Sequence, residues 1–166
     1  MMEIDRRALL LGVGGVALCG TGGVMLLGGQ PAEAQKGRFA FTLSDAEWRR
    51  RLGPQRYAIL REAHTERAGT SPLNDEHRRG TFHCAGCALP LFSSRTKFDS
   101  GTGWPSFWQP LPRAVGTSTD STLGMRRTEV HCARCGGHLG HIFNDGPRPT
   151  GLRYCINGLS LTFRAA

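Results

Sequence analysis

The feature that most constrains this chain is a pair of Cys-x-x-Cys motifs, formed by Cys84 with Cys87 and by Cys132 with Cys135. Thiolates are ligands that suit tetrahedral zinc, and each motif supplies two of them from one tight turn. A site closed by four thiolates has no open coordination position, so we expect a structural zinc. Because residues 88–131 separate the motifs, the metal should join distant segments of one domain.

Two other interpretations of these motifs stay open. The four cysteines could form two disulfides, which an exported location would favour. A thioredoxin-type redox pair is the other alternative, but it needs a strand-helix-strand context that this sequence does not show. Glycines lie in both turns, as in Cys84-Ala-Gly-Cys87 and in Cys135-Gly-Gly137, and turns of this kind favour a metal knuckle.

The remaining cysteine outside the N-terminal segment is Cys155, in Arg153-Tyr-Cys-Ile-Asn157. A cysteine is a useful nucleophile only when its surroundings favour the thiolate. On a strand, Arg153 and Asn157 would share the face of Cys155, because alternate residues point to the same side. Taken alone, an isolated cysteine is more often a buried core thiol. The residue types therefore leave both roles open.

The N-terminal segment is typical of an export signal. Arg6-Arg7 precedes an apolar, glycine-rich run at 8–29, and Ala32-Glu-Ala34 is a small-residue cleavage site. The run is long enough to span a bilayer, so an uncleaved membrane anchor is the alternative. Its many glycines, however, make it a poor permanent helix.

These signals divide the chain into three parts. We predict a twin-arginine signal peptide at 1–34, an N-terminal extension at 35–43 and a single domain at 44–166. The mature protein would then be exported, most simply to the periplasm. The length suffices for one domain with a real core, and we expect a monomer.

The chain is basic. Its net charge is +8, and removal of 1–34 takes away two arginines and three acidic residues, which makes it +9. The arginines are scattered from Arg38 to Arg164 and no nucleic-acid recognition motif accompanies them. We therefore interpret the charge as solvated surface and expect no nucleic-acid partner.

Helix signals come first in the predicted domain. Ser44-Asp-Ala-Glu47 is a capping box, and Gly53-Pro54 should end that short helix. A second helix should start at Pro54 and run toward His64 or Glu66, with three side chains turned inward: Tyr57, Ile59 and Leu60.

Strand and turn signals follow. Short segments bounded by Gly, Pro, Asn or Asp are typical of strands, and they cover 80–83, 125–131, 138–143 and 159–163. The pattern predicts two short N-terminal helices on an antiparallel, mainly β domain.

Longer motifs carry a family resemblance. They are Cys84-Ala-Gly-Cys87, Phe98-Asp-Ser-Gly-Thr-Gly-Trp-Pro-Ser-Phe107, Arg127-Thr-Glu-Val130, His138-Leu-Gly-His-Ile-Phe143, Asp145-Gly-Pro147 and Arg153-Tyr-Cys-Ile-Asn157. Together they resemble the signature of the methionine-R-sulfoxide reductases, the B-type enzymes, from about Ser44 to Phe163. The resemblance implies two antiparallel β-sheets with flanking helices, a structural zinc away from the active site and no organic cofactor. It also implies a nucleophilic cysteine at Cys155.

The implied reaction is reduction of methionine-R-sulfoxide in oxidised proteins. A thiolate attacks the sulfoxide sulfur and becomes a sulfenic acid while an acid protonates the oxygen. The resemblance implies that His141 and Asn157 organise or protonate that oxygen, with His138 nearby. Because His138 and His141 are three residues apart on a probable strand, we expect them on opposite faces. We favour His141 as the acid.

Substrate binding needs an apolar wall beside polar groups. Trp104, on a Gly-Trp-Pro turn, could pack against the methyl group and sulfur, and Phe143 is a second candidate. For both, simple core packing is the alternative. We also assign His138 and Arg153 to the substrate-binding set.

Two positions depart from the family pattern. Many relatives carry a resolving cysteine where this chain has Thr102, so an external thiol reductant, such as a thioredoxin-like protein, should reduce the sulfenic acid. Gly69 stands where the family usually has an aromatic residue.

Two competing functions come from other classes. A zinc-dependent binding module would use the cysteine knuckles, but it leaves Cys155 and Trp104 unexplained. A zinc hydrolase would use His64, Glu66 and the first cysteine pair as in deaminases, but it leaves the second pair without a role.

Overall fold

The computed structural model describes residues 39–121 and 124–166. The predicted signal peptide at 1–34 and the first part of the predicted extension lie outside the described residues. Within the described part, no helix combines the length and the apolar character needed to cross a membrane.

Helix α1, Asp45–Glu62, begins at the predicted capping box. The Ser44 hydroxyl accepts from the Glu47 amide at 3.3 Å, and the Glu47 carboxylate accepts from the Ser44 amide at 2.8 Å. Gly53 has φ +66°, which breaks the helical geometry just before Pro54. The element is thus two helical segments joined at a kink, as predicted.

The second segment of α1 ends earlier than predicted. Ala63 takes a left-handed conformation and the His64 amide bonds to the Ala58 carbonyl at 3.0 Å, so the helix ends at Glu62. The predicted inward side chains, Tyr57, Ile59 and Leu60, are buried.

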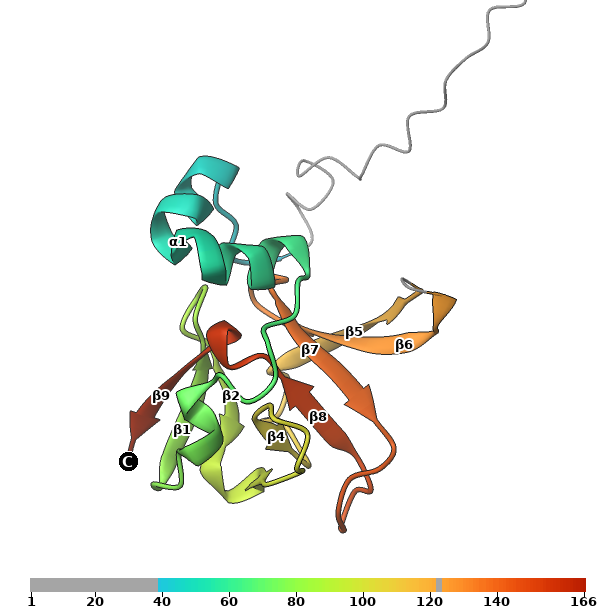
Figure 1. The fold of residues 1–166 in the computed structure, drawn as a ribbon. Coiled ribbons are helices and arrows are strands. Elements are labelled where there is room, and N and C mark those ends of the chain that lie inside the picture. Colours follow the sequence, from blue (N-terminus) through green and yellow to red (C-terminus); the bar gives the residue numbers. More distant parts are fainter. Residues whose placement is uncertain (1–38, 122–123) are drawn as a thin grey trace, which may run out of the picture. The chain divides into compact units, whose positions relative to one another are not determined.

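Two antiparallel sheets make up the rest of the domain (Figure 1), which confirms the predicted mainly β fold. The smaller sheet has the order β2-β1-β9, and the larger has the order β3-β4-β8-β7-β6-β5. The strands are β1 Gly80–Cys84, β2 Pro90–Ser93, β3 Lys97–Phe98, β4 Ser106–Phe107, β5 Val115–Asp120, β6 Arg127–Cys132, β7 His138–Phe143, β8 Arg153–Ile156 and β9 Leu161–Ala165. The described residues also form three short 3-10 helices: η2 Pro72–Asp75 before β1, η3 Ser94–Thr96 between β2 and β3, and η5 Gly158–Ser160 between β8 and β9.

Aromatic side chains join the two sheets in the core. Phe82 of β1 and Phe92 of β2 both contact Phe107 of β4, with ring centroids 5.0 Å and 4.3 Å apart. All three side chains are fully buried. Burial of such large apolar groups is the main driving force that holds one sheet against the other.

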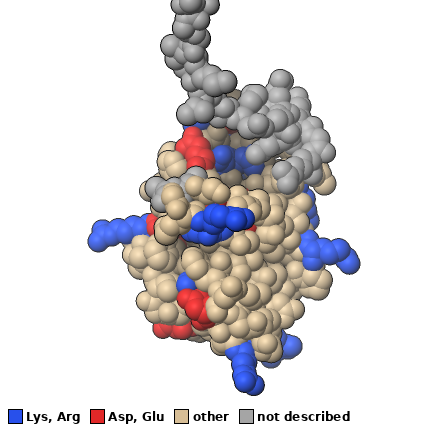
Figure 2. All heavy atoms as spheres, turned by 90° about the vertical axis from the view of Figure 1, so that its right-hand side faces the viewer, with Lys and Arg blue, Asp and Glu red and all other residues tan. Residues whose placement is uncertain are grey.

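The basic side chains are dispersed on the visible surface. Figure 2 shows Lys and Arg standing apart from one another on the face it draws, outside the atoms left grey. This distribution agrees with the scattered arginines of the sequence.

A β-bulge in β7 changes which side chains share a face. Val130 pairs with Gly140 and His131 pairs with His138, so Leu139 is an extra residue on β7. The bulge shifts the alternation by one residue, and the rings of His138 and His141 contact each other with centroids 5.4 Å apart. The prediction that these histidines point to opposite faces was therefore wrong.

Gly140 lies where β7 passes closest to β8. A Cβ at this position would sit 2.0 Å from the carbonyl oxygen of Cys155. A side chain here would therefore force apart the two strands that carry His141 and Cys155.

We predict that Gly140→Ala destabilises the domain by more than about 3 kcal/mol, since neither backbone can move without breaking the ladder. Gly151→Ala is the matched control, because Gly151 has φ +71° and open space around the added methyl. The control should cost only about 1–2 kcal/mol of backbone strain. Urea unfolding measures both variants, and equal losses would contradict the close-approach explanation.

Candidate active site

Cys155 lies in a row of directly paired residues across the larger sheet. Its partners are Ser106 of β4 on one side and His141 of β7 on the other, and His141 in turn pairs with Glu129 of β6. Residues directly opposite in an antiparallel sheet project from the same face. The row therefore places a thiol, an imidazole and a carboxylate on one surface.

The Cys155 thiol is half-buried and has a hydroxyl beside it. The Thr102 Oγ1 lies 3.9 Å from its Sγ. Burial raises the pKa of the Cys155 thiol above its ordinary value, while hydrogen bonds from Thr102 and Arg153 and the charge of Arg153 act to lower it. Burial thus opposes ionisation of the Cys155 thiol, whereas the donors Thr102 and Arg153 favour it.

His141 is bonded to a carboxylate at the end of β5. Its Nε2 is 2.8 Å from Asp120 Oδ2, and Arg127 donates to the same oxygen at 2.7 Å. Burial lowers the pKa of His141, the Asp120 hydrogen bond raises it, and the neighbouring charges of Arg127 and His138 lower it. The ring is therefore oriented by Asp120 and is mainly neutral near pH 7.

His138 is buried and bonded to Glu129, with Nδ1 2.7 Å from Oε1. Glu129 also accepts from the Ser118 hydroxyl, and the His138 bond holds the pKa of Glu129 down at about 2. An ionised Glu129 can only accept, so Nδ1 of His138 is the donor in this bond. Its buried Nε2 has no hydrogen-bond partner among the described residues. That nitrogen can receive a polar group of a bound molecule.

Asn157 braces the end of β8. Its Oδ1 accepts from the Glu66 amide at 2.9 Å, and its Nδ2 donates to the Leu139 carbonyl at 3.1 Å. The Glu66 carboxylate in turn accepts from the amides of Gly158 and Leu159. Both the oxygen and the nitrogen of the Asn157 side-chain amide are therefore bonded to backbone groups. One of these groups belongs to Leu139, the bulge residue.

Arg153 is held on one side of Cys155 by a bidentate pair. It donates through Nε and Nη2 to Asp145, both at 2.8 Å, and its guanidinium lies 4.4 Å above the Phe143 ring. The Asp145 carboxyl responds with a lowered pKa caused first by the Arg153 hydrogen bond. Phe143, in register with Arg153, thus has an arginine over one ring face.

Trp104 lies in the loop that also carries Thr102. Its Nε1 donates to the Glu66 carbonyl at 3.2 Å and the residue is partly exposed. The indole is therefore fixed by one hydrogen bond with part of its surface free.

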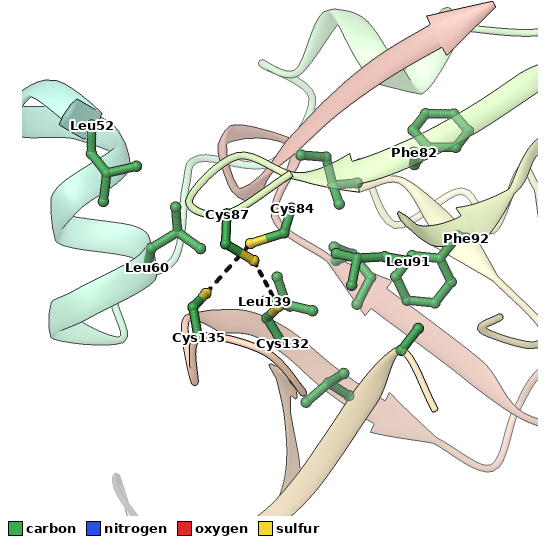
Figure 3. Packing of buried hydrophobic residues seen from close by; sticks show 14 of the residues in the cluster. Leu52, Leu60, Phe82, Cys84, Cys87, Leu91, Phe92, Cys132, Cys135 and Leu139 are labelled. Atoms are coloured by element: carbon green, nitrogen blue, oxygen red, sulfur yellow. Dashed lines mark hydrogen bonds between the residues drawn. The ribbon is translucent and has the colours of Figure 1, made fainter. Parts of the chain in front are cut away.

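The four motif cysteines meet in one buried cluster, formed by the β1–β2 and β6–β7 turns (Figure 3). The closest sulfur pairs are Cys87 with Cys132 at 3.5 Å and Cys84 with Cys135 at 3.7 Å, and all four sulfurs lie within 4.8 Å of one another. These separations exceed a disulfide bond of about 2.05 Å. They match the edge of about 3.8 Å that a tetrahedron with Zn–S bonds of about 2.3 Å requires.

Side chains from α1 and β6–β7 surround the knuckles. Arg51 donates to the Gly86 carbonyl at 2.6 Å, Arg61 to the Cys135 carbonyl at 3.1 Å and Arg134 to the Cys87 carbonyl at 3.1 Å. Positive charge beside a tetrathiolate offsets part of its negative charge.

The cluster decides against the hydrolase alternative. Both cysteine pairs belong to one site, and the Glu66 carboxylate is instead bonded to the amides before β9. A binding module stays unsupported, since it gives no reason for the row through Cys155.

Several residues that orient the site were not assigned to it from the sequence, where Glu66 was named for the hydrolase alternative. Asp120, Glu129, Glu66 and Asp145 each orient a predicted residue. Glu129 and Asp145 lie within motifs that carried the resemblance, which was the available signal. Asp120 and Glu66 act across 21 and 91 residues of sequence, so local patterns could not link them to the site.

The Asp120–His141 pair predicts a titration shift. Asp120→Asn removes a hydrogen bond that favours the charged imidazolium, so the pKa of His141, already lowered by burial, should fall further. An NMR titration of the His141 ring measures this, with Asp145→Asn as a control carboxylate that does not touch His141. A pKa that rises or stays constant in Asp120→Asn would contradict the assigned role of Asp120.

Comparison with known proteins agrees with this geometry. The SelR domain matches residues 52–165. The chain is 60% identical over 121 residues to the peptide methionine sulfoxide reductase MsrB of Thiobacillus denitrificans, which covers 72% of this chain and 92% of that protein. It is 59% identical to the MsrB of Agrobacterium fabrum, covering 72% and 90% respectively, and 52% identical to the chloroplastic B1 enzyme of Arabidopsis thaliana, covering 80% and 66%. The chain belongs to the MsrB family of peptide methionine sulfoxide reductases, which are oxidoreductases.

Proposed function

We propose that this chain reduces methionine-R-sulfoxide in oxidised proteins to methionine, with Cys155 as the nucleophile. The observation that carries the proposal is the row in which Cys155 stands directly opposite His141, beside Thr102 and Arg153. Among the described residues, Cys155 is also the one cysteine outside the four-sulfur cluster. It is thus the thiol free to react.

The chemical step transfers one oxygen atom. The Cys155 sulfur attacks the sulfoxide sulfur and forms an S–S bond. An S–O bond then forms on Cys155 while the S–S bond and the S–O bond of the substrate break, so methionine leaves and Cys155 is left as a sulfenic acid. The substrate sulfur gains two electrons and the cysteine sulfur loses two. A proton must reach the oxygen as its bond to the substrate weakens. Over the whole step the hydrogen lost by the thiol equals the hydrogen found on the sulfenic acid.

The surrounding residues supply the proton and the geometry. We assign His141 as the proton donor in its imidazolium form, which carries a hydrogen on both ring nitrogens, because it faces Cys155 in register and Asp120 fixes its ring. The unpartnered Nε2 of His138 is a second polar contact for the substrate. Asn157, whose amide is bonded to backbone on both sides, supports the site by fixing the end of β8.

Trp104 and Phe143 provide the apolar side of the site. We assign the exposed part of Trp104 to the substrate methyl group, because a methyl and an oxygen then occupy different subsites around a fixed sulfur. Phe143 packs against Arg153 at the start of β8. Phe143 therefore acts on the site by holding the Arg153 guanidinium.

We further propose that the four-cysteine cluster binds one structural zinc. The cage supplies four thiolates at tetrahedral separations, and the bound ion would tie the two turns together. The export signal at 1–34 and a monomeric mature chain are also part of the proposal, supported by the sequence alone.

Zinc content tests the cage. The purified protein should hold about one zinc per chain, and Cys132→Ser should lose the ion along with most soluble protein, because structural zinc contributes on the order of 10 kcal/mol to small folds. Elemental mass spectrometry gives the stoichiometry, and Cys155→Ser is the matched control that should keep its zinc. Well-folded, active protein without zinc would rule the proposal out.

Activity toward separated epimers tests the chemistry. With dithiothreitol as reductant, the protein should reduce the R epimer of a sulfoxide peptide, and Cys155→Ser should lose at least about 1,000-fold in kcat/KM because the nucleophile is gone. Chromatographic product analysis should show little reduction of the S epimer. Substantial activity in Cys155→Ser, or equal use of both epimers, would refute the assignment.

Turnover should depend on an external thiol. Four of the six cysteines lie in the cluster, Cys19 lies in the predicted signal and Cys155 reacts, so no thiol is left to resolve the sulfenic acid. Thr102→Cys places a second sulfur beside Cys155, since Thr102 Oγ1 is already 3.9 Å away. After one turnover, mass spectrometry should find a 102–155 disulfide in the variant and no Cys155 disulfide in the unmodified chain. A disulfide to a cluster cysteine at the rate of turnover would contradict this scheme.

A further inference from the structure

Three hydroxyl groups form a continuous chain that ends on the Cys155 sulfur. The fully buried Ser106 donates to the Trp104 carbonyl at 3.1 Å, and its oxygen is 2.7 Å from the Ser100 hydroxyl. The Ser100 oxygen is 2.8 Å from Thr102 Oγ1, which lies 3.9 Å from Cys155 Sγ. The chain therefore has four links between a carbonyl at one end and a thiol at the other.

Counting hydrogens fixes the direction of this chain when Cys155 is a thiol. A carbonyl only accepts and each hydroxyl carries one hydrogen, so Ser106 must donate to Trp104 and accept from Ser100. Ser100 then accepts from Thr102. The Thr102 oxygen is left as an acceptor for the S–H of Cys155. Four hydrogens fill all four links.

The thiolate form has one hydrogen fewer. A thiolate can only accept, so Thr102 must turn its hydrogen toward the sulfur. Two hydroxyl oxygens 2.7–2.8 Å apart repel each other when no hydrogen lies between them, so Ser100 and Ser106 turn after it. The Trp104 carbonyl then loses its bond at the far end. The exchange is favourable because a hydrogen bond to a charged sulfur is roughly twice as strong as a neutral one.

We propose that Thr102, Ser100 and Ser106 form a reversible hydroxyl relay that stabilises the Cys155 thiolate by reversing its direction. Thr102 touches the reacting sulfur, and the two serines are positioning residues that set the cost of the reversal. The inference rests on the proposed function in taking Cys155 as the nucleophile. It also gives a role to the hydroxyl that stands here in place of a resolving cysteine.

Charged groups around Cys155 act on every variant alike. Arg153 lies on β8 and Asp145 lies in the loop before it. His141 lies on β7, directly opposite Cys155. Burial raises the pKa of Cys155 and the Thr102 hydrogen bond lowers it, which agrees with a donor role for Thr102 in the ionised form. None of the three hydroxyl substitutions removes one of these charges.

The relay predicts shifts of opposite sign at its two ends. Thr102→Val removes a strong bond to the charged sulfur from the thiolate form, whereas one of the two links it removes from the thiol form is the weak S–H bond. It should therefore raise the pKa of Cys155 by about half to one pH unit, and Thr102→Ser should restore it. Ser106→Ala removes two links from the thiol form but one from the thiolate form. It should therefore lower the pKa by about half to one unit. Ser100→Ala likewise costs the thiol form two links and the thiolate form one, because Ser106 can then turn back to the Trp104 carbonyl. It should therefore also lower the pKa of Cys155.

The experiment measures the alkylation rate of Cys155 by iodoacetamide against pH in the zinc-loaded protein, with mass spectrometry of the peptide that contains Cys155. Thr150→Val is the control, because it removes two hydrogen bonds outside the relay, one donated to the Trp108 carbonyl and one accepted from the Leu152 amide. Its midpoint should not move. Ser100→Ala carries the test if the buried Ser106→Ala fails to fold.

Opposite shifts at Thr102 and at the serines support the relay. An unchanged midpoint in Thr102→Val, or serine variants that shift upward with it, would overturn it. A merely structural role would move all variants in one direction or none. Since alkylation needs no substrate, inactive protein with the predicted shifts would refute the proposed function and leave the relay standing.

Discussion

The four buried cysteine sulfurs are the contact on which the rest of the domain depends. They join the β1–β2 turn of the smaller sheet to the β6–β7 turn of the larger one, and α1 covers them with Leu60 directed at the sulfurs (Figure 3). Four thiolates within 4.8 Å of one another in a buried site repel each other unless a cation neutralises their charge, and a bound metal ion does this best. The turn they anchor leads directly into β7 and its bulge, so the clamp and the active site share one strand.

The active site depends on register. The pairing of β4, β8 and β7 brings Ser106, Cys155 and His141 into one row, and the bulge at Leu139 adds His138 to the same side. Carboxylates from β5 and β6 then orient both imidazoles. Polar groups that are bonded in this way lose little entropy when substrate arrives, because their positions are set beforehand. The scaffold thus positions the polar groups around Cys155 before substrate binds.

The sequence predicted the fold class, the four-sulfur cluster and the kinked pair of helices, because caps, Gly-Pro stops and cysteine spacing act locally. It did not single out β2, β3 and β4, of which β3 and β4 have two residues each, or β5, whose polar sequence lacks the alternating apolar residues typical of a half-buried strand. The error on His138 and His141 arose because a bulge is a property of the pairing between strands, not of one strand. Partners distant in sequence, such as Asp120 and Glu66, were not predicted because their contacts also depend on how the chain folds back on itself. The catalytic and substrate-binding roles stay predictions for all seven residues to which they were assigned: Trp104, His138, His141, Phe143, Arg153, Cys155 and Asn157.

The central claim is that Cys155 itself takes the sulfoxide oxygen. A single-turnover experiment without reductant tests it most directly: the zinc-loaded protein is mixed with excess R-sulfoxide peptide and dimedone, and both product and adduct are counted. The account predicts about one methionine per chain, with dimedone attached to Cys155 alone. Continued product formation without reductant, or an adduct on a cluster cysteine in place of Cys155, would contradict it.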